Sequence, residues 1–299
     1  MRRESEKNNH LDLWNRGVAY EVAFWNNLLR WNHFYGSSSN KVDELVEHME
    51  LTGFDVDAYL ASRESPKVLD VGAGMSYLAG NYIKKDGQKE FVDIQFVDPL
   101  AFHYNKILSK YHRKLPTIKF GMVEYLSSYF ENGSIDLVII QNALDHSFDP
   151  IKGIRECMIT LKIGGVLYLN HHPNEAETER YKGFHQYNIS LEDGKLMISD
   201  RNNHYDINEM LQPYAEFRSL TDEESGHVIN IITKQREVPI EWHKQAEDVA
   251  NLSKTLARPQ SIMQNCKTQL NFYFYNIIQF FVQSLSWENR MRLKRLLKR

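Results

Sequence analysis

The sequence predicts an α/β fold, a doubly wound and mostly parallel seven-stranded sheet with helical additions at both ends. Two observations lead to this class. Between residues 64 and 235, short β-branched runs alternate with stretches of helical periodicity, as in βαβ units joined by right-handed crossovers. Toward the end of this region, two extended runs are separated only by a polar turn, which indicates an antiparallel edge to the sheet.

Residues 1–63 are predicted to form an N-terminal helical cap. Apolar residues recur at helical spacing from Leu13 to Trp31, and a second amphipathic stretch runs from Val42 to Leu51. The many aromatic side chains of this region have two interpretations. They pack in the core, which is the favoured one, or they form a lid over a substrate pocket.

The central domain, residues 64–235, carries the predicted strands. These are residues 67–71, 91–97, 117–120, 135–140, 165–169, 217–220 and 228–233. We expect helices between the parallel strands, including one immediately after the glycine-rich end of the first strand and one over Pro150–Leu161. An insertion around residues 187–199 contains Asp193-Gly194, which predicts a β-hairpin.

Residues 236–299 are predicted to form a C-terminal helical extension. We expect a helix from Trp242 to Leu256, and an aromatic stretch from Phe272 to Val282 precedes a basic end from Arg290 to Arg299. The favoured interpretation is that this tail packs on the domain or on a second copy of the chain in a homodimer. The alternative is peripheral contact with the inner face of a membrane.

Composition narrows the class of protein. The chain has 299 residues, of which 42% are hydrophobic and 25% charged, as in soluble globular proteins. A net charge of -3 argues against a surface that coats nucleic acid. Cys157 and Cys266 belong to no Cys pair or Cys/His cluster, so no zinc motif is present. Without a signal peptide or a run of about 20 apolar residues, we expect a cytoplasmic protein.

The segment Val68–Ser76 is the most informative of the chain. A buried strand runs into Gly72 and Gly74, which allow a tight turn and a close approach of backbone to ligand. A dinucleotide-binding loop would have a third glycine where Tyr77 stands. Asp70, at the end of the strand, would repel a pyrophosphate but suits the cationic amine of a methionine. The loop therefore favours S-adenosylmethionine over NAD.

A second carboxylate, Asp98, ends the next predicted strand. Its distance from Gly74 is close to the interval of about 20 residues expected for an acid that binds ribose hydroxyls. The alternative is a turn-forming Asp before Pro99. Taken together with the glycine loop, ribose binding is the favoured interpretation.

In this order, the segments resemble the class I S-adenosylmethionine-dependent methyltransferases across residues 65–235. Asp70–Gly74 resembles motif I of that family, and residues 121–126 resemble its adenine-binding segment. Residues 135–146 are similar to its fourth-strand motif, and residues 161–167 to the turn before its fifth strand. The shared order of the motifs makes the resemblance specific, since each motif alone is weak.

The resemblance implies a Rossmann-like methyltransferase fold that binds S-adenosylmethionine. The cofactor-binding residues that it implies are Asp70, Gly72, Ala73, Gly74, Asp98, Pro99, Val123, Glu124, Gln141 and Asn142. The family usually has an acidic residue where Met122 stands, which leaves the Val123 backbone and Glu124 as candidates to contact the adenine amino group. A narrower resemblance is to a bacterial subgroup often found among surface-polysaccharide genes. It is carried by residues 98–101, 142–147, 174–177 and 185–188.

Candidate catalytic residues follow the fourth and fifth predicted strands, because ligands of open α/β sheets bind at the carboxyl ends of strands. Asp145, His146 and His171 are these candidates. Methyl transfer depends mainly on orientation, and a hydroxyl acceptor also gains from a general base. An imidazole titrates near neutral pH and suits that role. The alternative role for His146 is to fix its own loop.

Candidate substrate-binding residues lie after the fifth predicted strand. They are His172, Asn174, Glu175, Glu177, His185 and Gln186. Glu175, Glu177 and His185 also suggest a divalent cation such as Mg²⁺ or Mn²⁺. Their spacing matches no ligand motif, so a divalent metal is not expected, and these acids are predicted to bind substrate or to face solvent.

The leading hypothesis is a methyltransferase that modifies a polar acceptor, a hydroxyl of a saccharide or glycan precursor. A second hypothesis is a non-catalytic subunit that binds S-adenosylmethionine in a glycan-biosynthesis complex. A nicotinamide-dependent oxidoreductase is disfavoured by Tyr77. No nucleic-acid partner is expected.

Overall fold

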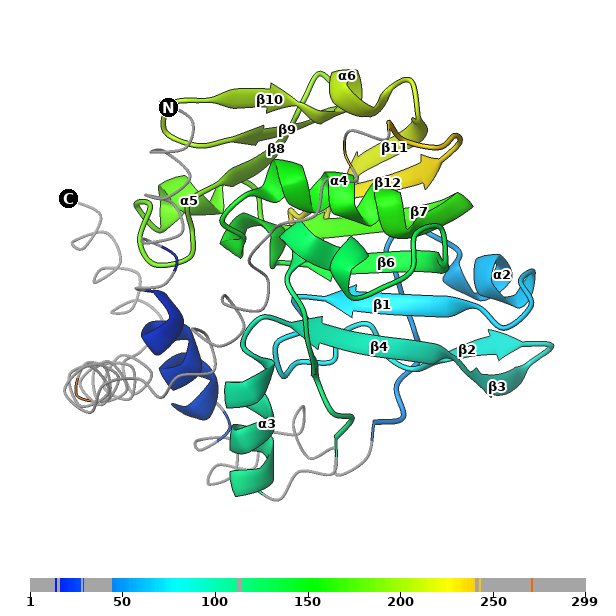
Figure 1. The fold of residues 1–299 in the computed structure, drawn as a ribbon, viewed down its shortest axis with the longest axis horizontal. Helices are drawn as coiled ribbons and strands as arrows, with labels where there is room; N and C mark the ends of the chain where they lie inside the picture. Colours follow the sequence, from blue (N-terminus) through cyan, green and yellow to red (C-terminus); the bar gives the residue numbers. More distant parts are fainter. Residues whose placement is uncertain are drawn as a thin grey trace.

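The computed structural model describes Trp14, residues 17–27, Leu29, residues 45–111 and 115–239, Trp242 and Leu270. Within these residues, a seven-stranded sheet in the order β11-β12-β7-β6-β1-β4-β5 forms the centre of the molecule (Figure 1). Its strands are β1 (Lys67–Val71), β4 (Asp93–Asp98), β5 (Lys119–Phe120), β6 (Ile135–Gln141), β7 (Leu161–His171), β11 (Ala215–Thr221) and β12 (Val228–Lys234). The strands from β5 across to β7 pair in parallel, whereas β12 is antiparallel to both β7 and β11. The predicted fold class is confirmed.

Helical segments cover both faces of this sheet. Besides residues 17–27, they are α2 (Val56–Ala61), α3 (Ala101–Lys110), η2 (Val123–Ser128), η3 (Leu144–His146), α4 (Pro150–Thr160), α5 (Glu175–Thr178) and α6 (Ile207–Leu211). The side chains of β1 alternate between two cores. Leu69 packs in the same core as Ile154 of α4, and Val68 packs in the same core as Leu60 of α2. The central parallel strands are therefore buried on both faces, which explains their nearly continuous apolar sequence.

A small antiparallel sheet follows α5 and lies beside the main sheet (Figure 1). It consists of β8 (Asn188–Glu192), β9 (Lys195–Ser199) and β10 (His204–Asp206). Asp193 and Gly194 join β8 to β9 with φ angles of 51° and 76°, the left-handed conformations that a two-residue hairpin turn requires. The predicted hairpin is confirmed.

The helix expected after β1 is absent, and this prediction was wrong. Residues 72–81 form turns and bends, and the chain then makes a hairpin of β2 (Tyr82–Lys85) and β3 (Gln88–Phe91). Asp86 and Gly87 make the turn with φ angles of 51° and 76°. An Asp-Gly pair favours such a turn, and this local preference prevails over the expected alternation of strand and helix.

Two further expectations were wrong in detail. The described part of the amphipathic stretch, residues 45–51, is not helical, because its backbone bonds to the β2–β3 hairpin: the N–H of Met49 donates to the carbonyl of Tyr82 at 2.8 Å. β7 begins at Leu161 instead of Gly165, directly after α4. α4 itself confirms the helix predicted over Pro150–Leu161, and the side chain of Asp149 caps it by accepting the N–H of Lys152.

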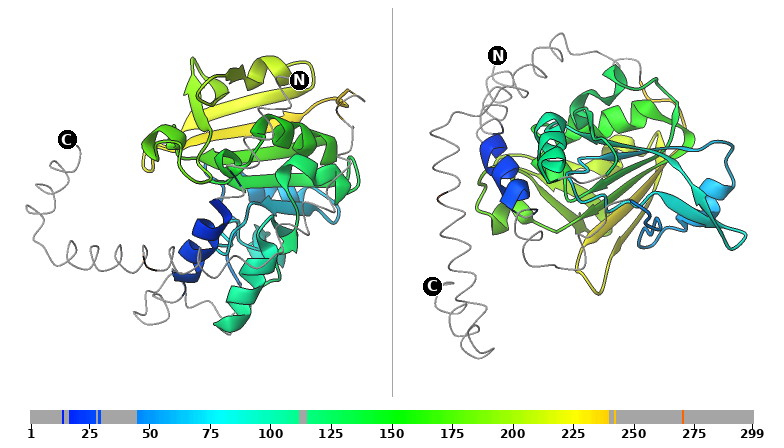
Figure 2. Two further views of the ribbon diagram at one scale, coloured as in Figure 1. Left: turned by 60° about the vertical axis from the view of Figure 1, so that its left-hand side comes forward. Right: turned by 90° about the horizontal axis from the view of Figure 1, so that it is seen from below.

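The N-terminal helix, residues 17–27, lies beside α3 in every view (Figures 1 and 2). Asn26 near its end accepts a hydrogen bond from Lys110 of α3 at 3.2 Å. The predicted helix from Trp242 to Leu256 and the aromatic and basic tail lie outside the described residues, apart from Trp242 and Leu270. In the described part of the chain, no helix combines the length and the apolar character needed to span a bilayer.

Candidate cofactor site and catalytic cluster

The glycine loop after β1 is closely packed against the segment that follows β6. Gly72 has a φ of 73°, and its N–H donates to the carbonyl of Val97 at 2.8 Å. A Cβ on Gly72 would lie 2.4 Å from the Cβ of Ala143. Only glycine therefore fits, both because of the left-handed backbone and because of this contact. The segment after β6 therefore lies against the glycine loop.

Two buried carboxylates flank the glycine loop, Asp70 at the end of β1 and Asp98 at the end of β4. Burial raises the pKa of both to about 7, and the nearby charge of Asp98 adds to the effect on Asp70. Among the described residues, no lysine or arginine forms an ion pair with either carboxylate. A cationic ligand at this place would supply the missing charge, as the sulfonium and ammonium groups of S-adenosylmethionine would.

Asp98 combines both roles that its sequence allows. Its Oδ1 accepts the N–H of Leu100 at 2.7 Å, which forms the turn before α3. Its Oδ2 accepts the N–H of Gly74 at 3.1 Å and so ties β4 to the glycine loop. A carboxylate has about four lone-pair sites, which leaves acceptor capacity for ribose hydroxyls. Pro99 follows half-buried and precedes α3.

The N-terminal helix lies on the glycine loop, which the sequence did not specify. A Cβ on Gly74 would lie 2.8 Å from the indole of Trp25, whose Nε1–H donates to Glu21 at 2.8 Å. The charge of Glu21 contributes to the raised pKa of Asp98. Glu21 and Trp25 are therefore site residues that the sequence reasoning missed. The aromatic density of this region, interpreted there as core or lid, was the available indication.

The candidate adenine residues, Val123 and Glu124, are buried in η2. The Oε1 of Glu124 accepts the N–H groups of Phe148 at 2.9 Å and Asp149 at 3.4 Å. This carboxylate thus holds the loop that leads into α4, and it is less available to adenine than the sequence suggested. The Val123 backbone remains the better candidate.

Gln141 and Asn142 connect the carboxyl ends of β6 and β7. Asn142 has a φ of 47°, its N–H donates to the carbonyl of Asn170, and its Oδ1 accepts the N–H of His172. The Nε2 of Gln141 is buried and has no hydrogen-bond partner. A ligand carbonyl or carboxylate would satisfy this donor.

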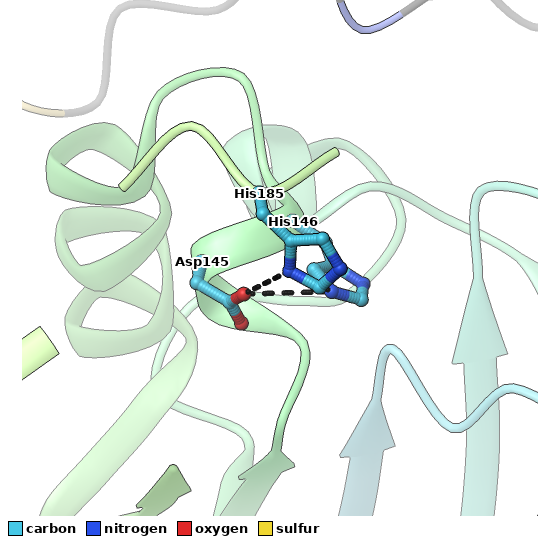
Figure 3. A group of neighbouring side chains, drawn as sticks. All are labelled: Asp145, His146 and His185. Atoms are coloured by element: carbon cyan, nitrogen blue, oxygen red, sulfur yellow. Dashed lines mark hydrogen bonds and ion pairs between the residues drawn. The ribbon is translucent and has the colours of Figure 1, made fainter. Parts of the chain in front are cut away.

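A cluster of one carboxylate and two imidazoles forms where η3 meets the loop before β8 (Figure 3). The Nε2 of His146 lies 3.1 Å from the Nδ1 of His185. The Oδ2 of Asp145 lies 3.2 Å from that Nδ1 and 3.4 Å from the Nε2 of His146. In Figure 3 both rings face the carboxylate. We call these three residues the Asp145 cluster.

A third imidazole, His171, lies beside the cluster at the end of β7. It is 1% exposed, and neither of its ring nitrogens has a hydrogen-bond partner. Its Nδ1 is 3.9 Å from Oδ1 of Asp145, an oxygen that is also buried and without a partner. His172, the next residue, is exposed, and its ring meets that of His227 edge to face with centroids 3.9 Å apart. Of these two histidines, His171 is thus buried and His172 is exposed.

The histidines control the charge of the cluster. Burial alone would raise the pKa of Asp145, but His146, His185 and His171 together lower it to about 2. Burial lowers the pKa of His171 to about 4, against the opposite effect of Asp145. At neutral pH the carboxylate of the cluster therefore stays ionised, and the imidazole of His171 beside it stays neutral.

The structure brings only part of the predicted substrate-binding set to the cluster. The Oε1 of Glu175 lies 3.9 Å from Nδ1 of His185. Glu177 is turned to Asn188, whose Nδ2 donates to it at 3.4 Å. Gln186 donates to backbone carbonyls of its own loop at 3.0 Å, and Asn174 precedes α5 with a φ of 54° and makes no side-chain capping bond.

The N-terminal region also supports the cluster, through a residue that the sequence reasoning did not place in the site. The indole N–H of Trp14 donates to the carbonyl of His146 at 2.7 Å. The indole ring stacks on Phe184, whose neighbour in the chain is His185, with ring centroids 5.0 Å apart. Trp14 therefore contacts both histidine-bearing segments and fixes their relative position.

Comparisons with known proteins agree with this geometry. A family model described as a methyltransferase domain matches residues 69–169, which run from β1 through β7. None of the curated proteins matches the sequence.

Several solved structures are similar to the chain. A CurJ carbon methyltransferase is 15% identical, with a TM-score of 0.38 and coverage of 58% of this chain and 50% of that one. A possible histamine N-methyltransferase from Thermotoga maritima is 17% identical, with a TM-score of 0.38 and coverage of 60% and 90%. A 16S rRNA methyltransferase from T. thermophilus is 14% identical, with a TM-score of 0.34 and coverage of 63% and 41%. The chain thus spans half or less of the length of two of these three.

The family match covers the segment that contains the glycine loop and both buried carboxylates. Residues 69–169 are similar to a methyltransferase domain, and the main sheet of the described residues contains β1, β4, β5, β6 and β7 of that segment in one parallel array.

Proposed function

We propose that this protein transfers a methyl group from S-adenosylmethionine to a polar acceptor, a hydroxyl of a saccharide or glycan precursor. The observation that carries the proposal is the position of the Asp145 cluster. It lies at the carboxyl ends of β6 and β7, and the contact between Gly72 and Ala143 places it next to the glycine loop. Donor and acceptor sites then share one edge of the sheet, as open α/β folds require.

The residues of the glycine loop bind and orient the cofactor. Asp70 faces its cationic amino-acid end, Asp98 accepts from its ribose hydroxyls, and Gly72 and Gly74 let the backbone approach. When bound, S-adenosylmethionine supplies a methyl group that is already activated by a positive sulfur. The contribution of the protein is then mainly orientation, which removes about 7–11 kcal/mol from the barrier of a well-aligned reaction.

The Asp145 cluster provides the polar surface for the acceptor. The side chains of His146 and His185 are each 24% exposed, so an acceptor can reach them, whereas Asp145 behind them is 4% exposed. A hydroxyl must lose its proton as its oxygen bonds to the methyl carbon and the carbon–sulfur bond breaks. A charged, hydrogen-bonding cluster at this place favours that loss, and it suits a hydroxylated acceptor more than an apolar one.

We also propose that residues 1–63 act as a cap on the domain of residues 64–235, with residues 236–299 as an extension. The support is the contact of Trp25 with the glycine loop and of Trp14 with the His146 backbone. Closing these two places excludes water from donor and acceptor together.

The test is an assay for S-adenosylhomocysteine release with nucleotide sugars, free saccharides and lipid-linked glycans, set against amine and catechol acceptors of similar size. Mass spectrometry of the product locates the methyl group. We expect methylation of a sugar hydroxyl. Methylation only of nitrogen or carbon would overturn the proposed acceptor, and tight cofactor binding with no turnover on any acceptor would favour a non-catalytic subunit.

A further inference from the structure

The three donor atoms of the Asp145 cluster converge on one point. His146 Nε2, His185 Nδ1 and Asp145 Oδ2 are separated pairwise by 3.1, 3.2 and 3.4 Å. Donor atoms bound at about 2.0–2.2 Å to one tetrahedral ion lie roughly 3.3–3.6 Å apart, and octahedral neighbours lie roughly 3.0 Å apart. The observed triangle falls in this range. We infer that Asp145, His146 and His185 bind a divalent transition-metal ion.

Hydrogen bonds can satisfy at most two sides of this triangle, because its three atoms cannot all face one another as donor and acceptor. If Nδ1 of His185 carries the proton, it donates to Asp145 and can share that proton with an unprotonated Nε2 of His146, but Nε2 and Oδ2 of Asp145 then face each other as two acceptors at 3.4 Å. If His146 donates to that nitrogen instead, an unprotonated nitrogen faces the carboxylate oxygen at 3.2 Å, and two acceptors repel. A cation at the centre removes the conflict, because all three atoms then direct a lone pair at it.

The second, independent observation is the set of unpartnered polar atoms behind the triangle. Oδ1 of Asp145 and both ring nitrogens of His171 are buried without hydrogen-bond partners. Such atoms are uncommon in folded proteins, and an ion with its water shell is one explanation for them. His171, 3.9 Å from Oδ1, stands where an outer partner would hold the ligand carboxylate in place once the ion is bound.

The donor set indicates the kind of ion. Two imidazole nitrogens and one carboxylate oxygen suit Zn²⁺, Mn²⁺, Fe²⁺ or Co²⁺, whereas Mg²⁺ and Ca²⁺ prefer oxygen donors throughout. Three protein ligands leave at least one position open, as in catalytic zinc sites. The partial exposure of His146 and His185 provides the route by which an ion and then an acceptor could enter. The sequence reasoning chose Glu175, Glu177 and His185 as the conceivable ligands, and only His185 is among the three that converge.

The role of the ion rests on the proposed function, although its binding does not. A hydroxyl coordinated at the open position would lose its proton to solvent near neutral pH, and the resulting alkoxide oxygen would take the methyl group as the carbon–sulfur bond breaks. His146, predicted from sequence as a free base, would then act as a ligand. Acceptors with two adjacent hydroxyls, which can chelate the ion, would be preferred.

The binding test uses the full chain, stripped of metal by chelator, and Zn²⁺ alone as the probe in titration calorimetry. We expect one tightly bound Zn²⁺ per chain. Asp145→Asn, His146→Ala and His185→Gln should each weaken binding by more than about 100-fold, beyond the roughly 10–100-fold effect of losing an outer partner. His204→Ala is the matched control. It removes a histidine that lies 3.4 Å from Glu192 and that, among the described residues, belongs to no three-donor group.

Binding of S-adenosylhomocysteine shows whether each variant is folded. Variants that bind it normally and also bind Zn²⁺ as the wild type does would overturn the inference, and so would equal loss in His204→Ala. If a variant binds neither Zn²⁺ nor S-adenosylhomocysteine, the wild-type protein is loaded with Cu²⁺ instead. Electron spin echo measurements then count the imidazole nitrogens bound to the ion. Two imidazole ligands support the site, and fewer overturn it.

If the protein binds Zn²⁺ but methylates no hydroxyl, the proposed function is refuted and the metal site is still supported. If metal-free protein methylates a sugar hydroxyl at full rate, the proposed function stands and the role of the ion in the reaction is refuted.

Discussion

Replacing Gly72 by alanine tests whether the loop after β1 is built for close approach. Gly72 has a φ of 73°, and a Cβ there would lie 2.4 Å from the Cβ of Ala143. A left-handed backbone costs a non-glycine residue about 1–2 kcal/mol. The overlap adds about 1–3 kcal/mol, because the two segments must move apart. We therefore expect Gly72→Ala to lower the free energy of unfolding by about 2–5 kcal/mol.

Two matched variants separate these contributions. Gly87 has a φ of 76° and nothing within 4 Å of its missing Cβ, so Gly87→Ala reports the backbone cost alone. Ala143→Gly removes the atom that the new Cβ would meet, so the double variant should recover about 1–3 kcal/mol relative to Gly72→Ala. Urea unfolding measures all the variants, and calorimetry with S-adenosylhomocysteine measures the accompanying loss of cofactor affinity. The reasoning is refuted if Gly72→Ala costs no more than Gly87→Ala, or if Ala143→Gly restores nothing.

The remaining predictions concern the buried carboxylates and the N-terminal helix. Asp70 and Asp98 have pKa values of about 7 in the folded apoprotein, against an ordinary 3.8. Their protonated forms therefore stabilise the fold fully when the pH is below 3.8, and this contribution is lost as the pH rises through 7. The increase in Tm caused by S-adenosylmethionine should therefore be larger at about pH 8 than at about pH 6, and an equal increase at both would contradict it. Asp98→Ala should weaken cofactor binding by about 1–3 kcal/mol, about 5- to 150-fold, because its hydroxyl and N–H partners lose their acceptor; unchanged affinity in calorimetry would remove Asp98 from the site. Trp25→Ala should speed the release of S-adenosylhomocysteine in stopped-flow experiments, whereas Tyr20→Ala, 57% exposed on the same helix, should not. Equal release rates in the two would mean that the helix does not cover the loop.

The central strands could be predicted because their sequence has one physical interpretation. Ile135–Gln141 is apolar at nearly every position, and only a strand buried on both faces uses such a run at this length. The hairpin after the glycine loop was predictable in part, since Asp86-Gly87 is a turn pair. It was missed because the expected alternation of strand and helix outweighed a local preference.

The candidate site could be predicted only as far as topology fixes it. Asp145 and His146 follow the fourth parallel strand, so their place at the carboxyl edge follows from the fold alone. The partnership with His185 could not be inferred, because that residue lies 39 positions beyond His146 in an irregular loop that no periodicity relates to η3. The contact of Trp25 with Gly74 is of the same kind, a tertiary contact between segments whose sequences show no sign of each other.

The path of the chain after β1 also determines the charge that the glycine loop presents to a ligand. A helix that began at Gly72 would bring about half a positive charge to the loop and attract phosphate there. Residues 72–81 instead run into a hairpin, so the local potential is set by two carboxylates and not by aligned peptide dipoles. Ligands whose charge resides on phosphates gain nothing at this position and are repelled. Replacing one carboxylate should therefore weaken the repulsion of phosphate but should not create a phosphate site, because the backbone offers no helix N-terminus at Gly72.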